Sequence, residues 1–110
     1  MDINISNVDD GAVLALKGEL DYNSYKDFNA KVLDLIDKKT KKIIIDMAGV
    51  EHIDSMGLGA VTKLWKIADE NGLSLFLSGV PANVRKMIKL VNLDKRIKIF
   101  DGVRDALKQP

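Results

Sequence analysis

Hydrophobic and polar positions change their spacing along the chain, and each change predicts a strand, a helix or a turn. Ile3 and Ile5 alternate with polar residues as in a short strand, and residues 9–11 (Asp-Asp-Gly) predict a hairpin turn after it. Glycine adopts positive φ freely, and Asp supports a turn with its side chain. Residues 12–16 are almost all apolar, so we expect a second strand there that is buried on both faces.

A first helix is predicted where the apolar spacing changes to three and four residues. Its buried stripe would consist of Tyr25, Phe28, Val32, Leu35 and Ile36. Asn23 or Ser24 would be its N-cap, and the lysine-rich segment 38–42 places positive charge near its C-terminus. Residues 43–46 (Ile-Ile-Ile-Asp) are mostly β-branched and predict the central strand, followed by a loop over residues 47–54.

The remaining half of the chain alternates between helical and strand patterns. Residues 73–77 and 97–100 predict strands, and residues 103–107 predict a terminal helix. Asn71-Gly72 ends a second helix, whose stripe would contain Leu58, Val61, Leu64, Trp65 and Ala68, with Trp65 in the core or at its edge. A third helix is predicted from Val84, Met87, Ile88 and Val91. This order predicts an α/β sandwich with a mixed, mostly parallel sheet of roughly four to five strands and about four helices.

Length and charge limit the function classes that remain. At 110 residues, the chain is expected to form one domain over residues 1–110. Seventeen Lys and Arg against sixteen Asp and Glu leave a formal charge of +1, which does not favour nucleic acid or an anionic membrane as a partner. With no cysteine and one histidine, we expect no metal and no cofactor. Because we recognise no signal peptide or membrane-spanning apolar run, we expect a soluble, cytoplasmic protein.

The most unusual segment is 53–59, Ile-Asp-Ser-Met-Gly-Leu-Gly, at the expected start of the second helix. Two glycines in a first turn cost about 1 kcal/mol each relative to alanine, so helix propensity does not explain them. Glycine exposes backbone amides, and a helix N-terminus carries partial positive charge, which favours an anion such as phosphate. Alternatively, Asp54 or Ser55 is only an N-cap, and the glycines relieve crowding against the sheet. The residues alone leave both interpretations open.

Three other chemistries fit the sequence less well. Residues 57–59 lack the Lys-Ser/Thr pair of a P-loop and the third glycine of a dinucleotide fingerprint. His52, Asp54 and Ser55 are near neighbours, whereas hydrolase groups converge from separate segments, so we interpret His52 as a surface-loop histidine and assign no catalytic residue. Asp46 follows a strand as the phospho-accepting aspartate of a receiver domain does, but the acidic pair and the late Lys-Pro pair of receivers are not in place. We interpret Asp46 as a strand-end residue that turns the chain or caps a neighbour.

Gly18-Glu19-Leu20-Asp21, residues 43–46 and Asp54-Ser55-Met56-Gly57-Leu58-Gly59 together resemble the anti-sigma factor antagonists, the small free-standing STAS domains of bacteria. The resemblance covers nearly the whole chain, as far as Val91-Asn92-Leu93, and Asp-Ser-x-Gly-Leu-Gly is its most specific part. It implies a STAS-like fold and a regulator of transcription that is not an enzyme. It also implies phosphorylation of Ser55 by a cognate anti-sigma factor that is an ATP-dependent serine kinase. The unphosphorylated form would bind this kinase and free the sigma factor, and a serine phosphatase would reset the cycle.

The resemblance also indicates a contact surface around Ser55. Its expected members are Asp21, Tyr22, Asn23, Ser24, Asp54, Met56, Gly57, Leu58 and Gly59. Met56 occupies a position that is often small or polar in relatives, so it would enlarge the partner contact or fit the local core. Because STAS domains also occur in sulfate-transporter tails, lipid-transport subunits and stress-sensing complexes, membership of such an assembly is the alternative. We expect a monomer or a weak dimer.

Phosphorylation at Ser55 would act through charge. A phosphoserine adds roughly −1.5 to −2 charges. The amides of residues 56–59 and the helix dipole would hold the phosphate, whereas a partner that desolvates the loop would meet an unpaired dianion beside Asp54. We therefore expect phosphorylation to abolish binding and to leave the fold intact.

Overall fold

The first two strands form the expected hairpin. In the computed structural model, which describes residues 1–109, β1 (Asp2–Val8) pairs antiparallel with β2 (Gly11–Leu20). The turn differs from the expectation in one detail, because Asp9 and not Gly11 has the positive φ, at 52°. Asp adopts this left-handed conformation more readily than most residues that have a side chain. Gly11 instead lies close to the neighbouring strand, where an added Cβ would be 3.0 Å from the Lys42 carbonyl oxygen.

The sheet has five strands in the sequential order β1-β2-β3-β4-β5, so β3 (Lys42–Ile53) is central as predicted. Strand β4 (Ser74–Ser78) and the two-residue β5 (Ile99–Phe100) complete it. All pairs after the first hairpin are parallel, which confirms the expected mixed, mostly parallel sheet. Parallel strands need long crossover connections, and the helices between them supply those connections.

Strand β3 is longer than the sequence predicted. The expected loop over residues 47–54 is wrong, because residues 47–53 continue the strand and pair with the end of β2, up to Leu20 opposite Ile53. Two register shifts interrupt this pairing, and Gly18 has a φ of 109° there, which a residue with a side chain rarely adopts. Met47, Val50 and Ile53 are buried at a spacing of three. The bulged pairing hides the two-residue period from the sequence and brings the end of β3 to the start of the second helix.

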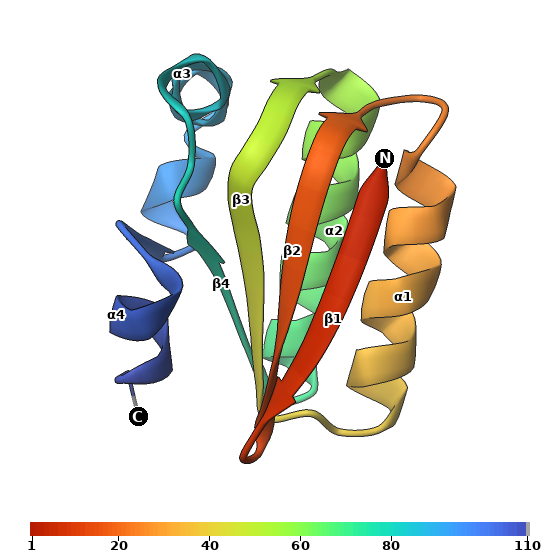
Figure 1. The fold of residues 1–110 in the computed structure, drawn as a ribbon, viewed down its shortest axis with the longest axis vertical. Coiled ribbons are helices and arrows are strands. Elements are labelled where there is room, and N and C mark those ends of the chain that lie inside the picture. The colour runs from red at the N-terminus through yellow and green to blue at the C-terminus, as the bar shows by residue number, and fades with distance from the viewer. Residues whose placement is uncertain (110) are drawn as a thin grey trace.

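Helices cover both faces of the sheet, as Figure 1 shows. On one face, α1 (Tyr25–Asp37) and α2 (Ser55–Glu70) lie side by side over the larger core cluster, to which α3 (Ala82–Leu90) also contributes. On the other face, α4 (Val103–Leu107) closes a smaller cluster of Val13, Ile44, Phe76 and Ala106. A short 3-10 turn, η1 (Leu93–Lys95), connects α3 to β5. The fold class predicted from the sequence is confirmed.

The predicted helical stripes agree with the buried faces in most positions. The expected positions of α1 from Phe28 onward are buried, and Trp65 on α2 is half-buried against the core, as expected. The third helix differs, because Val91 is 57% exposed and Met87 is 36% exposed. Helix α3 ends at Leu90, so Val91 follows the last turn and does not face the sheet. Within residues 1–109, no helix combines the length and the hydrophobicity that crossing a lipid bilayer requires.

Candidate functional site

The start of α2 is fixed by one carboxylate. Asp54 follows the buried end of β3 and is the N-cap of α2, with extended backbone angles. The Gly57 N–H donates to Asp54 Oδ1 over 2.9 Å, and the Leu58 N–H donates to the Asp54 carbonyl oxygen over 2.9 Å. Asp54 therefore satisfies the first amides of the helix and sets the direction in which Ser55 leaves the sheet.

The other carboxylate oxygen of Asp54 joins α2 to a second segment. The Tyr22 N–H donates to Asp54 Oδ2 over 3.0 Å, across 32 residues of sequence. The pKa of Asp54 lies below its ordinary value of 3.8, mainly because the Gly57 N–H binds the carboxylate. Burial opposes this shift, while the amides of Tyr22 and Met56 and the charge of His52 add to it. Asp54 is thus a fixed negative charge at neutral pH.

The segment that Asp54 holds is the turn of residues 21–24 between β2 and α1. Ser24 Oγ donates to the Glu19 carbonyl oxygen over 2.7 Å and accepts from the Asp21 N–H over 3.0 Å. The Asn23 N–H donates to Asp21 Oδ1 over 3.0 Å. Ser24, one of the two expected candidates, is the N-cap residue of α1. Its hydroxyl makes no cap hydrogen bond, because it bonds within the turn. The turn leaves Tyr22 67% exposed beside the start of α2.

The two glycines of the segment have different structural reasons. A Cβ on Gly57 would lie 2.2 Å from the Leu20 carbonyl oxygen, so the close approach of α2 to the end of β2 requires glycine. A Cβ on Gly59 would meet no atom within 4 Å. The crowding interpretation therefore explains Gly57. Nothing in the packing of residues 1–109 explains Gly59, although glycine weakens a helix by about 1 kcal/mol relative to alanine.

The predicted site residues separate into exposed and buried groups. Ser55, Met56 and Gly59 are exposed on α2, and Asp21 and Ser24 are half-buried in the turn beside exposed Tyr22 and Asn23. Gly57 and Leu58 are buried, so they support the site from below and present little surface to a partner. Met56 is 38% exposed, which places its thioether at the surface and not in the core.

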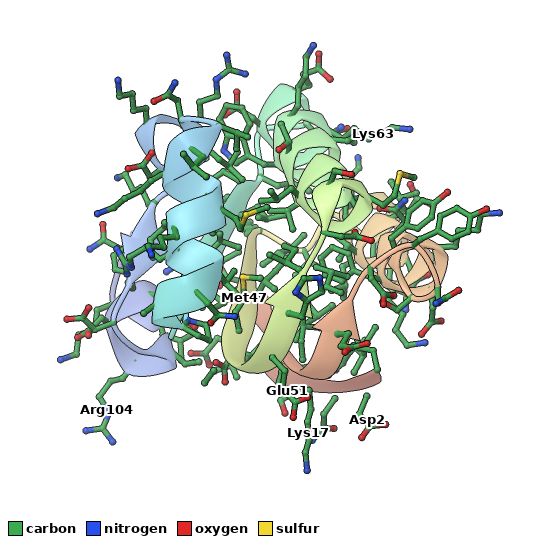
Figure 2. All side chains as sticks on the ribbon, turned by 90° about the horizontal axis from the view of Figure 1, so that it is seen from above. Asp2, Lys17, Met47, Glu51, Lys63 and Arg104 are labelled. Atoms are coloured by element: carbon green, nitrogen blue, oxygen red, sulfur yellow. The ribbon has the colours of Figure 1, made fainter. Side chains whose placement is uncertain are left out.

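Two surface hollows border Ser55, and both are lined by Gly59 and Lys63. One, of about 210 Å³, lies between α1 and α2, where Tyr25 and Asn29 line it from α1. The other, of about 470 Å³, lies on the α3 side of α2 and is mostly apolar, with Leu58, Thr62, Lys66 and Val91 in its lining. Figure 2 shows Lys63 extending from α2 on the side away from α3.

Sequence reasoning did not identify Lys63, Tyr25 and Asn29 as residues that line the site. Lys63 lies eight residues after Ser55, with Gly59 midway, and this spacing of four is a signal that the sequence contains. Tyr25 was expected only as a core residue, and Asn29 has no local signal. Both reach the site because α1 packs beside α2, which only the tertiary structure shows.

Two of the amides that were expected to hold a phosphate are already occupied. Asp54 accepts from the Gly57 amide with its carboxylate and from the Leu58 amide with its carbonyl oxygen. The prediction that the amides of residues 56–59 hold the phosphate is therefore wrong for Gly57 and Leu58. The positive end of the α2 dipole remains, but the carboxylate of Asp54 already neutralises part of it.

The other two candidate positions show no comparable arrangement. Asp46 lies within β3 and not at a strand end, because the strand continues to Ile53, and its Oδ1 accepts from the Ala48 N–H over 3.1 Å. Asp46 thus has one of its two expected roles, that of capping a neighbouring residue. His52 is exposed as expected, although it lies on the strand and not in a loop. In the described part of the chain, no group of His, Cys, Asp and Glu side chains has the geometry of a metal site.

Comparison with known proteins relates most of the chain to one family. A sequence model of the STAS domain matches residues 2–106. A Thermotoga maritima protein described as a candidate anti-sigma factor antagonist is 30% identical over 103 residues, which cover 93% of this chain and 91% of that protein. An anti-sigma-B factor antagonist of Staphylococcus epidermidis is 23% identical over 104 residues, covering 93% of this chain and 96% of that one.

Solved structures agree with the fold. The crystal structure of a candidate anti-sigma factor antagonist from Thermotoga maritima superposes with a TM-score of 0.91 at 29% identity, covering 96% of this chain and 92% of that one. The Bacillus cell fate determinant SpoIIAA in its phosphorylated form has a TM-score of 0.77 at 20% identity, with 96% of both chains covered. The second likeness supports the fold alone.

Proposed function

This chain belongs to the STAS domain family, and from that premise we propose that it is an anti-sigma factor antagonist switched by phosphorylation of Ser55. Unphosphorylated, it binds an anti-sigma factor that is also a serine kinase, and the sigma factor is released. Phosphorylated, it no longer binds, and a serine phosphatase restores the first state. The proposal is supported by the names of the relatives, which are described as anti-sigma factor antagonists, and by SpoIIAA, which shares the fold and has been solved in a phosphorylated form.

The exposure of Ser55 at the first position of α2 carries this proposal. Its hydroxyl lies at the surface, and the preceding Asp54 holds the helix start in one orientation through Gly57 and Leu58. Phosphorylation would transfer the γ-phosphoryl group of ATP to Ser55 Oγ, release ADP and pass the hydroxyl proton to a base of the kinase. An acceptor on a fixed helix end can be presented to a kinase without unfolding the chain.

The partner surface that we propose combines the α2 start with the adjoining turn. Tyr22, Asn23, Met56 and Gly59 are its exposed members, and Asp54 joins the two segments through Tyr22 and Gly57. A phosphate on Ser55 adds negative charge next to the ionised Asp54. A partner that excludes water here would have to bury that charge, at a cost of several kcal/mol. This cost is the proposed basis of the switch.

Kinase treatment followed by peptide mass spectrometry tests the acceptor. The chain is incubated with ATP and the anti-sigma factor kinase of the same organism, and the Ser55→Ala variant is treated in parallel. We expect one phosphate on the peptide that contains Ser55 and none on the variant. A phosphate on another residue, or an unmodified chain, would refute Ser55 as the acceptor.

A further inference from the structure

A phosphoryl group on Ser55 would need a counter-charge that the helix start does not supply. Asp54 already accepts from the amides of Gly57 and Leu58, and its carboxylate adds negative charge. The phosphate must therefore find another donor within reach or remain fully in water. The two hollows that border Ser55 offer different surroundings for it.

The hollow between α1 and α2 contains polar groups without partners. Asn29 Oδ1 is buried from solvent and forms no hydrogen bond within residues 1–109. Lys63 is exposed and takes part in neither of the ion pairs of the described chain, which join Lys31 to Asp27 and Lys38 to Asp34. A buried polar atom without a partner is uncommon in proteins and indicates that a further group can be accommodated beside it.

The position of Lys63 suits a group on Ser55. The two residues are eight positions apart on α2, about 12 Å along the helix axis, and helical side chains lean toward the N-terminus. Gly59 lies between them on the same stripe and has no side chain to block the path. The extended stem of Lys63 can thus lie over Gly59 and direct its ammonium group toward the helix start.

We propose that the phosphoryl group on Ser55 is held within the chain, in the hollow between α1 and α2, by the Lys63 ammonium group and the Asn29 side-chain amide. The inference rests on the proposed phosphorylation of Ser55. The unpartnered atom, Oδ1, is an acceptor and cannot bond a phosphate oxygen, so the Asn29 amide would rotate to put its NH₂ group in that place, where it donates to the phosphate. The phosphate would also fill the open space above Gly59. Phosphorylation would then change the shape of the partner surface as well as its charge.

Lys63 lines both hollows, so the neutral polar groups of α1 are what favour the α1 side of α2. Asn29 and Tyr25 line the hollow on that side together with Lys63, and they add a side-chain amide and a hydroxyl. The hollow on the α3 side is larger but mostly apolar, and Lys66 is its additional cation. A dianion is costly to place against apolar side chains, so the hollow where Asn29 and Tyr25 offer polar groups is the better site.

The test uses protein with phosphoserine incorporated at position 55 during synthesis, so that no kinase is needed. The ³¹P NMR signal of the phosphate is titrated against pH in the otherwise unchanged chain, in Lys63→Gln and in Lys66→Gln. The two variants remove the same charge from the same helix, one turn apart, and only Lys63 lines the α1-side hollow. A ¹H–¹⁵N spectrum also follows the side-chain amide of Asn29.

We expect the phosphate to titrate about 0.3 pH unit higher in Lys63→Gln than in the unchanged chain, as for the loss of a partly exposed ion pair. Lys66→Gln should titrate as the unchanged chain does, and the Asn29 amide signal should shift when Ser55 carries the phosphate. Equal titration in all three proteins, a larger change in Lys66→Gln, or an Asn29 amide signal that does not respond to the phosphate would overturn the proposal, because Lys63 borders both hollows and only Asn29 marks the one between α1 and α2. None of these results would bear on whether a kinase modifies Ser55, which the mass spectrometric experiment decides.

Discussion

At the scale of single residues, two glycines of one motif have separate purposes. Gly57 is needed because α2 passes close to the Leu20 carbonyl oxygen, whereas Gly59 faces open space. The sequence presents both glycines as the same signal. Their roles separate only when the path of β2 beside α2 is known, because the contact is between residues 37 positions apart in a bulged strand pairing.

The glycines predict opposite effects of one substitution. Gly59→Ala should raise the free energy of unfolding by up to about 1 kcal/mol, because alanine is the better helix former and has room there. Gly57→Ala should lower it by about 1–3 kcal/mol, since the new methyl group overlaps Leu20. Urea denaturation of both variants measures this. A destabilised Gly59→Ala, or a Gly57→Ala as stable as the original chain, would contradict the packing account.

Asp54 predicts a pH dependence of stability. Its pKa in the folded chain is lowered, chiefly by the Gly57 N–H, so its ionised form stabilises the fold above the unfolded-state value near 3.8. That contribution is lost as the pH falls through the lower folded-state pKa. In Asp54→Asn, the side chain still caps α2 but carries no charge. The variant should therefore be less stable than the original chain at pH 7, and the difference should shrink in acid.

The measurement is urea denaturation of both proteins at a series of pH values from 7 downward. Asp46→Asn serves as the control, because Asp46 makes a local contact with Ala48 and takes no part in the α2 start. A constant difference between Asp54→Asn and the original chain across the series would show that the carboxylate charge contributes nothing.

At the scale of elements, the helices were easier to predict than the extent of β3. Helices α1 and α2 have regular apolar stripes and clear stop signals, so their positions follow from the sequence. Residues 47–53 contain a glycine and two polar or charged residues, which locally favour a loop. Pairing with the end of β2 makes them a strand, and the register shifts between the two strands conceal the alternation that a sequence pattern would need.

The connection between the turn of residues 21–24 and α2 predicts an effect on hydrogen exchange. Asp54 accepts from the Tyr22 N–H with one carboxylate oxygen and from the Gly57 N–H with the other. Asp54→Ala removes both acceptors, so both amides should exchange faster with solvent. The expected loss of stability is about 1 kcal/mol, as for other N-cap residues.

Hydrogen exchange followed by NMR at neutral pH checks this prediction. The Ala48 amide, which donates to Asp46, is the internal reference because Asp54 does not contact it. Faster exchange of the Gly57 amide with unchanged exchange of the Tyr22 amide would mean that the turn and the helix are independent. The shared carboxylate would then have no structural role.

At the scale of the whole molecule, the fold class was accessible from the sequence, and the proposal of Ser55 as the acceptor also comes from it. The hairpin followed by alternating strands and helices gave the mixed sheet, and the resemblance of residues 54–59 indicated Ser55. The occupied amides at the helix start and the α1 side of the site were not accessible. They depend on which donors Asp54 uses and on where α1 packs, and neither is encoded in local spacing.

The molecule as a whole should tolerate negative charge at Ser55. Ser55 is exposed and belongs to neither of the two core clusters. Ser55→Asp should therefore unfold in one cooperative transition, with a free energy of unfolding within about 0.5 kcal/mol of the original chain. Thermal denaturation followed by circular dichroism checks this. A loss of cooperativity would mean that the switch acts by disrupting the fold and not through the surface.

The central claim is that a phosphate on Ser55 prevents binding while the fold persists. Its most direct test is calorimetric titration of the anti-sigma factor kinase, saturated with ADP so that no transfer occurs, with the chain carrying either serine or phosphoserine at position 55. We predict a stable complex for serine and an affinity at least about 100-fold weaker for phosphoserine, because the partner would have to bury the added charge at a cost of about 3 kcal/mol or more. Equal affinities for the two forms would contradict the account.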